Sequence, residues 1–266
     1  MRTSAGTGAQ TLTVGFAVSG IGDESVLIRA IGPTLASFGV TGVLADPQLQ
    51  LYSGTNVVTS NDNWATPTAG NGNATTLANA FTVAGAFTLA PAALDSALVR
   101  NLAAGSYTAQ ITTAGTSAAP SGIALAELYD TDPTGGARLV NASARAQVGT
   151  AADILIAGFS ISGNVPKQIL IRGIGPGLTQ FGVTGVLANP ILALYRGATK
   201  IGENDDWGGS ATLSTVFRDV GAFALANTTS RDSALLVTLA PGSYTAQVSG
   251  VNNTTGVALV EVYEVP

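Results

Sequence analysis

Short apolar segments separated by turn residues recur along the whole chain. In ALVEVYEV (258–265) successive side chains alternate between two faces, so that Glu261 and Tyr263 share one of them. Such segments are rich in β-branched residues and bounded by Gly, Pro and Asn, which predicts an antiparallel all-β sandwich or barrel. In the second half of the chain we expect strands near 153–162, 167–173, 190–196, 199–203, 233–239, 243–249 and 256–264, with equivalents in the first half.

Helical patterns are confined to two short segments, GPTLASFG at 32–39 and TLSTVFRDVG at 212–221. Each is expected to form a single turn, and Pro33 and Gly39 suit the start and the end of the first one. No helical pattern of ten or more residues separates successive strands, which excludes a parallel βαβ architecture.

The chain is an internal duplication. LIRAIGPTLASFGVTGVLADPQLQLYSG at 27–54 returns as LIRGIGPGLTQFGVTGVLANPILALYRG at 170–197, and DSAL at 95–98 returns at 232–235. Every aromatic residue has an aromatic counterpart in the other copy. We therefore predict two tandem jelly-roll-like antiparallel β-sandwich domains, at 1–130 and 137–266, joined by a linker at 131–136.

One strand-like segment, RLVNAS at 138–143, precedes the second copy and has no counterpart before the first. Two interpretations follow. The chain is a two-repeat excerpt of a longer array, or the first copy has an incomplete sheet edge that a neighbouring chain fills. The second interpretation draws on the fact that an unpaired edge is a template for strand addition.

Composition removes several classes of function. The chain of 266 residues has no Cys and no His, so it has no disulfide, no thiolate metal site and no imidazole base. A net charge of −5 and a charged fraction of only 10% argue against nucleic acid as a partner. No apolar run reaches the length of a membrane helix, so membrane insertion is not expected. The first residues lack the apolar segment of a signal peptide.

The charge-poor, cysteine-free composition is typical of a bacterial extracellular or cell-surface protein, which predicts that an export signal was removed from this segment.

Few charged residues are kept in both copies, and these are the candidate site residues. Arg29 and Arg172 lie in otherwise apolar strands, so their guanidinium groups require carboxylate and carbonyl partners. We expect a structural ion pair with Asp95 or Glu127 in the first copy, and with Asp232 or Glu261 in the second. The alternative is a clamp for an anionic or carboxylate ligand.

The segments Asn61-Asp62-Asn63-Trp64 and Asn204-Asp205-Asp206-Trp207 combine oxygen ligands with a large aromatic side chain. The favoured interpretation is a turn with a Trp packed in the core. The alternatives are a calcium site, since calcium takes oxygen ligands, and a Trp that stacks on a sugar. We predict no resident cofactor.

Catalysis without His or Cys would need paired carboxylates or a lysine, and Asp62 with Asp95, with its counterpart in the second copy, is a candidate pair. Nothing else marks a cleft, so we predict that the protein is not an enzyme. Two loops differ in length between the copies, 64–81 against 207–217 and 111–122 against 248–256. Such loops either tolerate insertion or set ligand specificity.

The LxLY-G strand, the Asn-Asp-x-Trp turn, DSAL and the LAPGSYTAQV hairpin closed by TGVALVEVY resemble the bacterial pre-peptidase C-terminal (PPC) type of domain. They also resemble the repeat modules of large secreted or surface-attached bacterial proteins. The resemblance covers 49–130 and 192–264 and leaves out the first third of each copy. It implies a jelly-roll-like, non-catalytic accessory module that is sometimes stabilised by calcium.

Two functions follow as hypotheses. The leading one is a structural protein whose tandem repeats form a stalk, coat or filament by self-association through sheet edges or with neighbouring repeats. The alternative is an adhesive module that binds a surface glycan or a cell surface.

Overall fold

The computed structural model describes residues 1–115, 121–132, 135–161, 163–225 and 227–266. Pro133 and Thr134 of the expected linker, and Ser162 of the expected strand 153–162, lie outside the described residues, as does the segment 116–120. The chain forms two compact units, Arg2–Ala142 (the first unit) and Ser143–Pro266 (the second unit).

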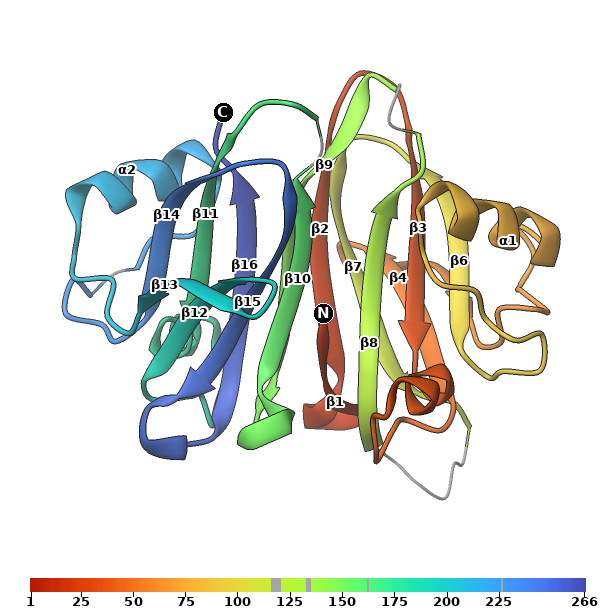
Figure 1. Cartoon of the computed structure of the whole chain (residues 1–266), viewed down its shortest axis with the longest axis horizontal. Helices are drawn as coiled ribbons and strands as arrows, with labels where there is room; N and C mark the ends of the chain where they lie inside the picture. Colours follow the sequence, from red (N-terminus) through yellow and green to blue (C-terminus); the bar gives the residue numbers. More distant parts are fainter. Residues whose placement is uncertain (116–120, 133–134, 162, 226) are drawn as a thin grey trace. The chain divides into compact units, whose positions relative to one another are not determined.

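The first unit is a jelly roll of two antiparallel sheets. One sheet has the order β1-β8-β3-β6 and the other contains β2-β7-β4-β5, with β9 next to β2 (Figure 1). The strands are β1 (Arg2–Gly6), β2 (Leu12–Gly20), β3 (Glu24–Ile31), β4 (Pro47–Ser53), β5 (Asn56–Asn61), β6 (Ser96–Leu102), β7 (Gly105–Thr113), β8 (Ser121–Asp130) and β9 (Ala137–Val148).

The second unit repeats this strand order. One sheet contains β9-β16-β11-β14 and the other contains β10-β15-β12-β13. The strands are β10 (Leu155–Ile161), β11 (Lys167–Ile174), β12 (Pro190–Arg196), β13 (Thr199–Asn204), β14 (Ser233–Leu239), β15 (Gly242–Gly250) and β16 (Gly256–Glu264). The predicted fold class, two all-β antiparallel jelly rolls related by duplication, is confirmed by this strand order.

The helices are longer than the sequence suggested. The first unit has α1 (Ala74–Val83) and the second has α2 (Ala211–Asp219), where a single turn was expected at most. Both helices begin at a side-chain cap, Asn73 and Ser210, whose oxygens accept from backbone amides of the first turn. The expectation failed because the apolar residues of each helix pack on a sheet, and tertiary packing supplies most helix stability.

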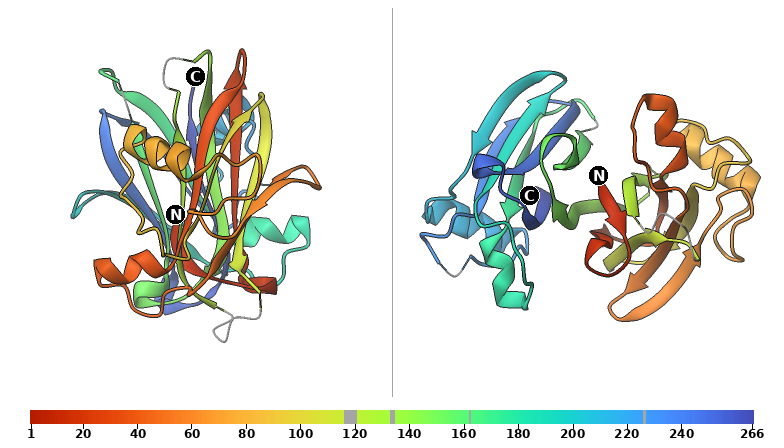
Figure 2. Two further views of the ribbon diagram at one scale, coloured as in Figure 1. Left: turned by 90° about the vertical axis from the view of Figure 1, so that its right-hand side faces the viewer. Right: turned by 90° about the horizontal axis from the view of Figure 1, so that it is seen from below.

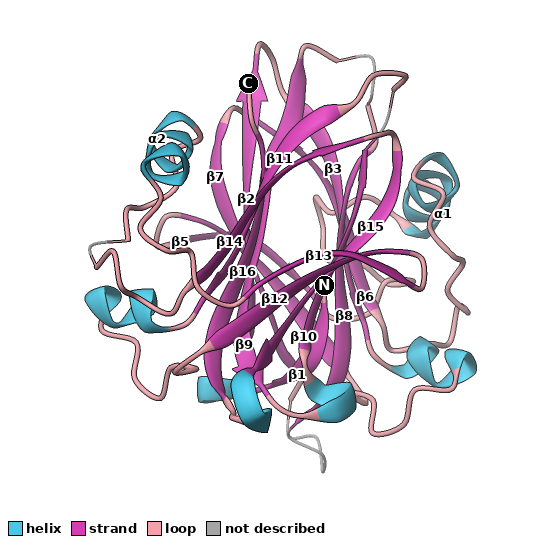
Figure 3. Cartoon of the chain, turned by 60° about the vertical axis from the view of Figure 1, so that its left-hand side comes forward, coloured by secondary structure: helices cyan, strands magenta, loops and turns pink. Residues whose placement is uncertain are grey.

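Shorter 3-10 helices lie in the connections. They are η1 (Gly8–Gln10), η2 (Pro33–Phe38), η3 (Ala151–Asp153), η4 (Pro176–Phe181) and η5 (Val251–Asn253). Figure 3 shows strands throughout both units, with the helices confined to the segments that connect them. None of the helices in the described part of the chain is long and apolar enough to cross a membrane.

Each unit has a second core outside the space between its sheets. In the first unit α1 packs on β3 and β6, and Leu77 and Phe81 are buried there with Trp64. In the second unit Phe217 of α2 is buried with Trp207. The path of the chain from the β4–β5 hairpin into α1 can be followed in Figure 2. This layer between helix and sheet contains Arg29 and Arg172, whose guanidinium groups lie against Phe81 of α1 and Phe217 of α2.

The segment without a counterpart belongs to the first unit. Residues 137–142 are grouped with Arg2–Ala142, and β9 lies beside β2. The backbone amide of Ile21, just after β2, donates to the Gly136 carbonyl at 3.1 Å. The expectation that a neighbouring chain fills this edge was therefore wrong, because the chain itself supplies the strand beside β2.

Candidate functional site

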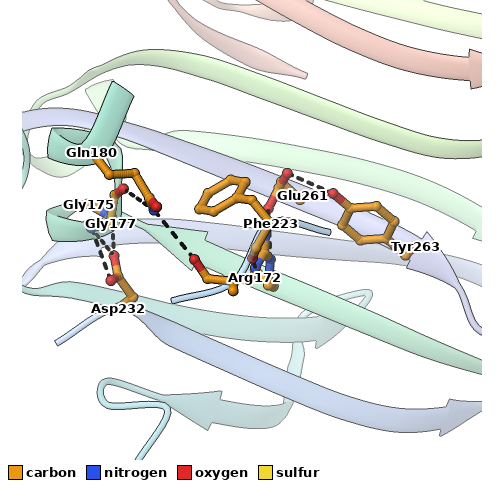
Figure 4. Close-up of polar contacts among 9 residues, drawn as sticks. Arg172, Gly175, Gly177, Gln180, Phe223, Asp232, Glu261 and Tyr263 are labelled. Carbon is orange, nitrogen blue, oxygen red and sulfur yellow. Dashed lines mark hydrogen bonds and ion pairs between the residues drawn. The ribbon is translucent and has the colours of Figure 1, made fainter. Parts of the chain in front are cut away.

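The second unit buries a complete guanidinium group beneath α2. Arg172 on β11 is fully buried, and its Nε donates to Glu261 Oε2 on β16 at 2.8 Å. Its Nη1 donates to the Phe223 carbonyl at 2.7 Å, and the Phe223 and Phe217 rings lie 4.3 and 4.7 Å from the guanidinium carbon. The Tyr263 hydroxyl donates to the other oxygen of Glu261 (Figure 4). The cation is thus held by a carboxylate, a carbonyl and two aromatic faces.

The first unit contains the equivalent residues, but the Arg29 Nε, Arg29 Nη2 and Glu127 Oε2 atoms make no hydrogen bond within the described structure. Arg29 on β3 is fully buried, with its Nε 3.1 Å from Glu127 Oε2 and its Nη1 2.8 Å from the Phe87 carbonyl. The Phe87 and Phe81 rings lie 4.3 and 4.6 Å from the guanidinium carbon. Tyr129 donates to Glu127 at 2.9 Å. In both copies the arginine faces the glutamate across the β3–β8 or β11–β16 register, so the ion pair forms with Glu127 and Glu261.

These clusters are closed structures. Burial lowers the pKa of Arg29, and the Glu127 carboxylate partly offsets this. Burial and the neighbouring glutamate raise the pKa of Tyr129 and of Tyr263, so both hydroxyls remain protonated donors. Because the guanidinium groups are fully buried against protein partners, this geometry supports the ion pair and leaves no exposed face for an anionic ligand.

Asp95 and Asp232 have a different role, which is to cap the 3-10 helix after β3 or β11. Asp95 is fully buried, and its Oδ1 accepts from the Gly32 amide at 2.8 Å and from the Thr34 amide at 3.3 Å. Asp232 accepts from the Gly175 amide at 2.8 Å and from the Gly177 amide at 3.0 Å (Figure 4). Each carboxylate therefore holds the connection that follows the arginine-bearing strand.

The two copies supply the last donor to this carboxylate from different places. In the first unit the Thr34 hydroxyl donates to Asp95. The residue equivalent to Thr34 is Gly177, and in the second unit the Ser230 hydroxyl donates to the aspartate instead. The residue equivalent to Ser230 is Ala93, which lines the same surface depression as Thr34. A hydroxyl lost at one position is thus present at the other.

Thr34→Gly should destabilise the first unit by about 1–3 kcal/mol, because it removes one donor from a buried carboxylate. Adding Ala93→Ser should restore about 1 kcal/mol or more, since the new hydroxyl takes the place that Ser230 has in the second unit. Urea unfolding followed by Trp64 fluorescence in a Trp207→Phe background measures both. Ala93→Ser alone is the control, and a purely additive double variant would contradict this compensation.

Both tryptophans are core residues. Trp64 is 6% exposed, its Nε1 donates to the Ala90 carbonyl at 3.0 Å, and its amide donates to the Asp95 carbonyl at 2.9 Å. Trp207 is 4% exposed, and its amide donates to the Asp232 carbonyl at 2.7 Å. A buried indole offers no platform for a sugar, so this geometry supports the favoured interpretation of a core-packed Trp.

Asp62 and Asp205 lie at the turns before these tryptophans. Asp62 adjoins Asp46, and burial together with the Asp62 charge raises the pKa of Asp46. Asp205 is exposed. Within the described residues, no group of three or more Asp and Glu side chains is arranged to hold a metal ion. The side chain that ties this turn to the sheet is Asn61, which is buried and donates to the Ala97 carbonyl at 2.7 Å.

One buried acid distinguishes the first unit from the second. Glu24, at the start of β3, is fully buried, and neither carboxyl oxygen has a hydrogen-bond partner in the described structure. Burial, with Asp130 and Asp132 nearby, raises the pKa of Glu24 to about 7. The equivalent pair in the second unit is Lys167 with Glu264, which form an ion pair at 2.7 Å. The first unit thus has two acids where the second has a salt bridge.

The sequence pointed to the arginines, aspartates and tryptophans but not to the groups that complete their surroundings. It missed the sandwiching phenylalanines and the buried acid, which are Phe81, Phe87, Phe217, Phe223 and Glu24. It named Asn61 as part of the turn but not its buried hydrogen bond to the sheet. The pairing of all aromatic residues between the copies was a signal for the phenylalanines. The charge reversal between Glu24 and Lys167 was a signal for the acid.

No family model matches the sequence, and no curated protein matches it. Among solved structures, the chain is similar to the major capsid protein P2 of bacteriophage PM2, with 9% identity, 100% of this chain and 98% of that chain covered, and a TM-score of 0.22. It is similar to the MCP of STIV, Sulfolobus turreted icosahedral virus, with 13% identity, 100% and 92% coverage and a TM-score of 0.22.

A lectin from Pleurotus ostreatus matches with 8% identity, 97% and 74% coverage and a TM-score of 0.20. Likeness at this level carries no functional argument. The jelly-roll assignment therefore rests on the strand order of the chain itself.

Proposed function

We propose that the protein is a non-catalytic structural subunit of the bacterial cell surface or extracellular space that self-associates through a sheet edge. The charged residues retained in both copies support the structural part of this proposal. Arg29, Asp95 and their counterparts are fully buried and hold strands and connections together. Their retention is explained by folding, which requires their charges to be paired or hydrogen bonded.

The edge strand β14 carries the proposal. In the first unit the equivalent edge, β6, is covered by the long loop after Trp64. The Val99 amide donates to the Asn71 carbonyl at 3.2 Å, and Arg100 Nη1 donates to the Gly70 carbonyl at 2.5 Å. In the second unit this loop is shorter, with ten positions from Trp207 to Phe217 against seventeen in the first. The loop residues that cover β6 have no counterpart there.

The β14 edge, on which only Thr238 is fully exposed, has the properties of a strand template. β14 (SALLVTL) contains no charged residue and no proline, and its neighbour in the sheet is β11. Proteins usually protect such an edge with lysine, proline or a covering loop. The first unit has the loop and Arg100, whereas Val237 stands at the position of Arg100 in the second. The Ala234 amide of β14 already donates to Asn204 Oδ1 at 2.9 Å. Pairing of β14 with a strand of another chain would satisfy its remaining outward backbone groups.

Thr238→Lys should therefore weaken self-association, because Thr238 is exposed on β14 and a lysine there places a charge on the edge. We expect wild-type protein to form concentration-dependent oligomers in sedimentation velocity and ordered assemblies in negative-stain electron microscopy. The variant should require at least about tenfold higher concentration, equivalent to about 1.4 kcal/mol.

Thr212→Lys is the matched control, because Thr212 is also an exposed threonine but lies on α2. It should assemble like wild type. A wild-type chain that stays monomeric at every concentration, with and without calcium, would overturn the proposed function. Equal effects of the two lysines would show that charge, and not the edge, controls association.

A further inference from the structure

The longest stretch that is identical in the two copies lies on an exposed loop. FGVTGVLA occurs at 38–45 and again at 181–188, although about half of the aligned positions differ elsewhere. Loops are normally the most variable parts of a fold, so identity there calls for a physical reason. Part of that reason is structural: Gly39 and Gly42 have positive φ values of 78° and 66°, and Leu44 is buried.

The aromatic residue at the start of this loop makes one ring contact and is otherwise largely exposed. Phe38 is 62% exposed and Phe181 is 59% exposed. Each lies edge-on to the phenylalanine that covers the buried arginine, with centroid distances of 5.1 Å to Phe87 and 4.9 Å to Phe223. More than half of each residue is thus open to solvent, and it adds apolar surface that a polar residue at this position would not.

The duplication provides an internal comparison for the other strongly exposed apolar side chains of the described residues. Most of them are aligned with a polar residue or a glycine in the other copy. The pairs are Ile21/Asn164, Val57/Lys200, Val83/Asp219, Leu94/Arg231 and Val165/Gly22. Ile201 is aligned with Val58, which is only partly exposed. Phe38 and Phe181 are therefore the pair in which a large exposed apolar residue is kept in both copies.

The chemistry around these rings selects the kind of partner. We define the Phe patch as residues 33–45 with 85–93 in the first unit, and 176–188 with 221–225 and 227–230 in the second; none of these segments contains a charged residue, and Arg231 follows directly in the second unit. A nucleic acid or an acidic peptide would need complementary charge. A sugar would need polar side chains near the ring that hydrogen bond to its hydroxyl groups. The nearby carboxylates, Asp95 and Asp232, are buried in their capping role.

An uncharged apolar surface that occurs twice per chain is best matched by the same surface on another chain. We propose that the Phe patches are contacts between copies of this protein, in which the patch of one chain packs against a patch of another. This inference rests on the proposed function, because both require self-association, but it concerns a contact separate from β14. Two like patches per chain make each molecule bivalent, so each chain has two places at which another chain can bind.

Replacing the two rings tests the contact. Phe38→Ser with Phe181→Ser should raise the concentration needed for association by about tenfold or more, while each single change has a smaller effect. Val83→Asp is the matched control, because Val83 is 63% exposed and the second unit already carries aspartate at the equivalent position. Sedimentation velocity measures association, and thermal unfolding verifies that each variant is folded.

A second measurement does not require removal of the rings. The chain has no cysteine, so a single Thr41→Cys places a unique thiol on the exposed loop of the Phe patch. Under mild oxidation it should form disulfide-linked dimers at least several-fold faster than Val83→Cys. Equal rates for the two thiols, or unchanged association of a folded double serine variant, would overturn the patch contact. If wild type associates and only Thr238→Lys weakens it, the proposed function stands and this inference fails.

Discussion

Replacing Glu127 with alanine should lower the free energy of unfolding of the first unit by about 3–5 kcal/mol, because it leaves the Arg29 guanidinium buried without a counter-charge. Arg29 is fully buried, and Glu127 is the carboxylate that contacts it. The Phe87 carbonyl and the two aromatic faces remain, but they do not neutralise a full charge. Urea unfolding followed by Trp64 fluorescence in a Trp207→Phe background measures the loss.

The matched control is Glu264→Ala, which removes the partly exposed ion pair with Lys167 and should cost less than about 1 kcal/mol in the second unit. The double change Arg29→Met with Glu127→Leu removes both charges and should recover most of the stability lost in Glu127→Ala. A loss below about 1 kcal/mol for Glu127→Ala would contradict the assignment of this ion pair as the element that neutralises Arg29.

The stability of the first unit should fall as the pH rises from about 4.5 to about 7. In the folded chain the pKa of Glu24 is about 7, against an ordinary value of 4.5, because the carboxyl is buried near Asp130 and Asp132. A raised pKa means that the folded state binds the proton more tightly than the unfolded state. The stabilisation is thus fully present below the unfolded pKa and is lost through the folded pKa, by at most roughly 3 kcal/mol.

Glu24→Lys should remove this pH dependence and stabilise the first unit at pH 8, because it places beside Asp130 the ion pair that Lys167 and Glu264 make in the second unit. The reciprocal change, Lys167→Glu, should destabilise the second unit at pH 8. Urea unfolding at pH 5 and pH 8, with Trp64 or Trp207 as the reporter of its own unit, measures both. A wild-type first unit with equal stability at the two pH values, after correction with Glu24→Gln, would contradict the role of Glu24.

The strands were predictable because their signal is local. Alternation of apolar and polar residues, bounded by Gly, Pro and Asn, predicted strands near all seven described strands from β10 to β16, and the repeated segments predicted the same architecture in the first unit. The helices were underestimated, because α1 and α2 depend on packing against β3 and β6 or their equivalents. The position of residues 137–142 was not predictable from the repeat alignment, because a strand can pair with either of its neighbours in the chain.

The site was predictable only in part. Sequence alone required a carboxylate partner for Arg29, but Asp95 and Glu127 satisfied that requirement equally well. The structure decides between them by register, since Arg29 lies opposite Glu127 on the neighbouring strand, whereas Asp95 caps the turn at Gly32. The length difference between the loops was visible in the sequence, but its effect on the exposure of a sheet edge was not.

The sequence by itself determined that this protein is a duplicated all-β fold with buried arginines, paired aromatics and no imidazole or thiol chemistry. These conclusions depend on composition, on local periodicity and on comparison of one copy with the other. Only the tertiary structure decided which carboxylate neutralises each arginine, that both tryptophans are buried, that Phe38 and Phe181 are exposed, and that β14 is an edge strand. Those features depend on contacts between residues far apart in the chain, and no local pattern encodes which distant segment will cover a given side chain.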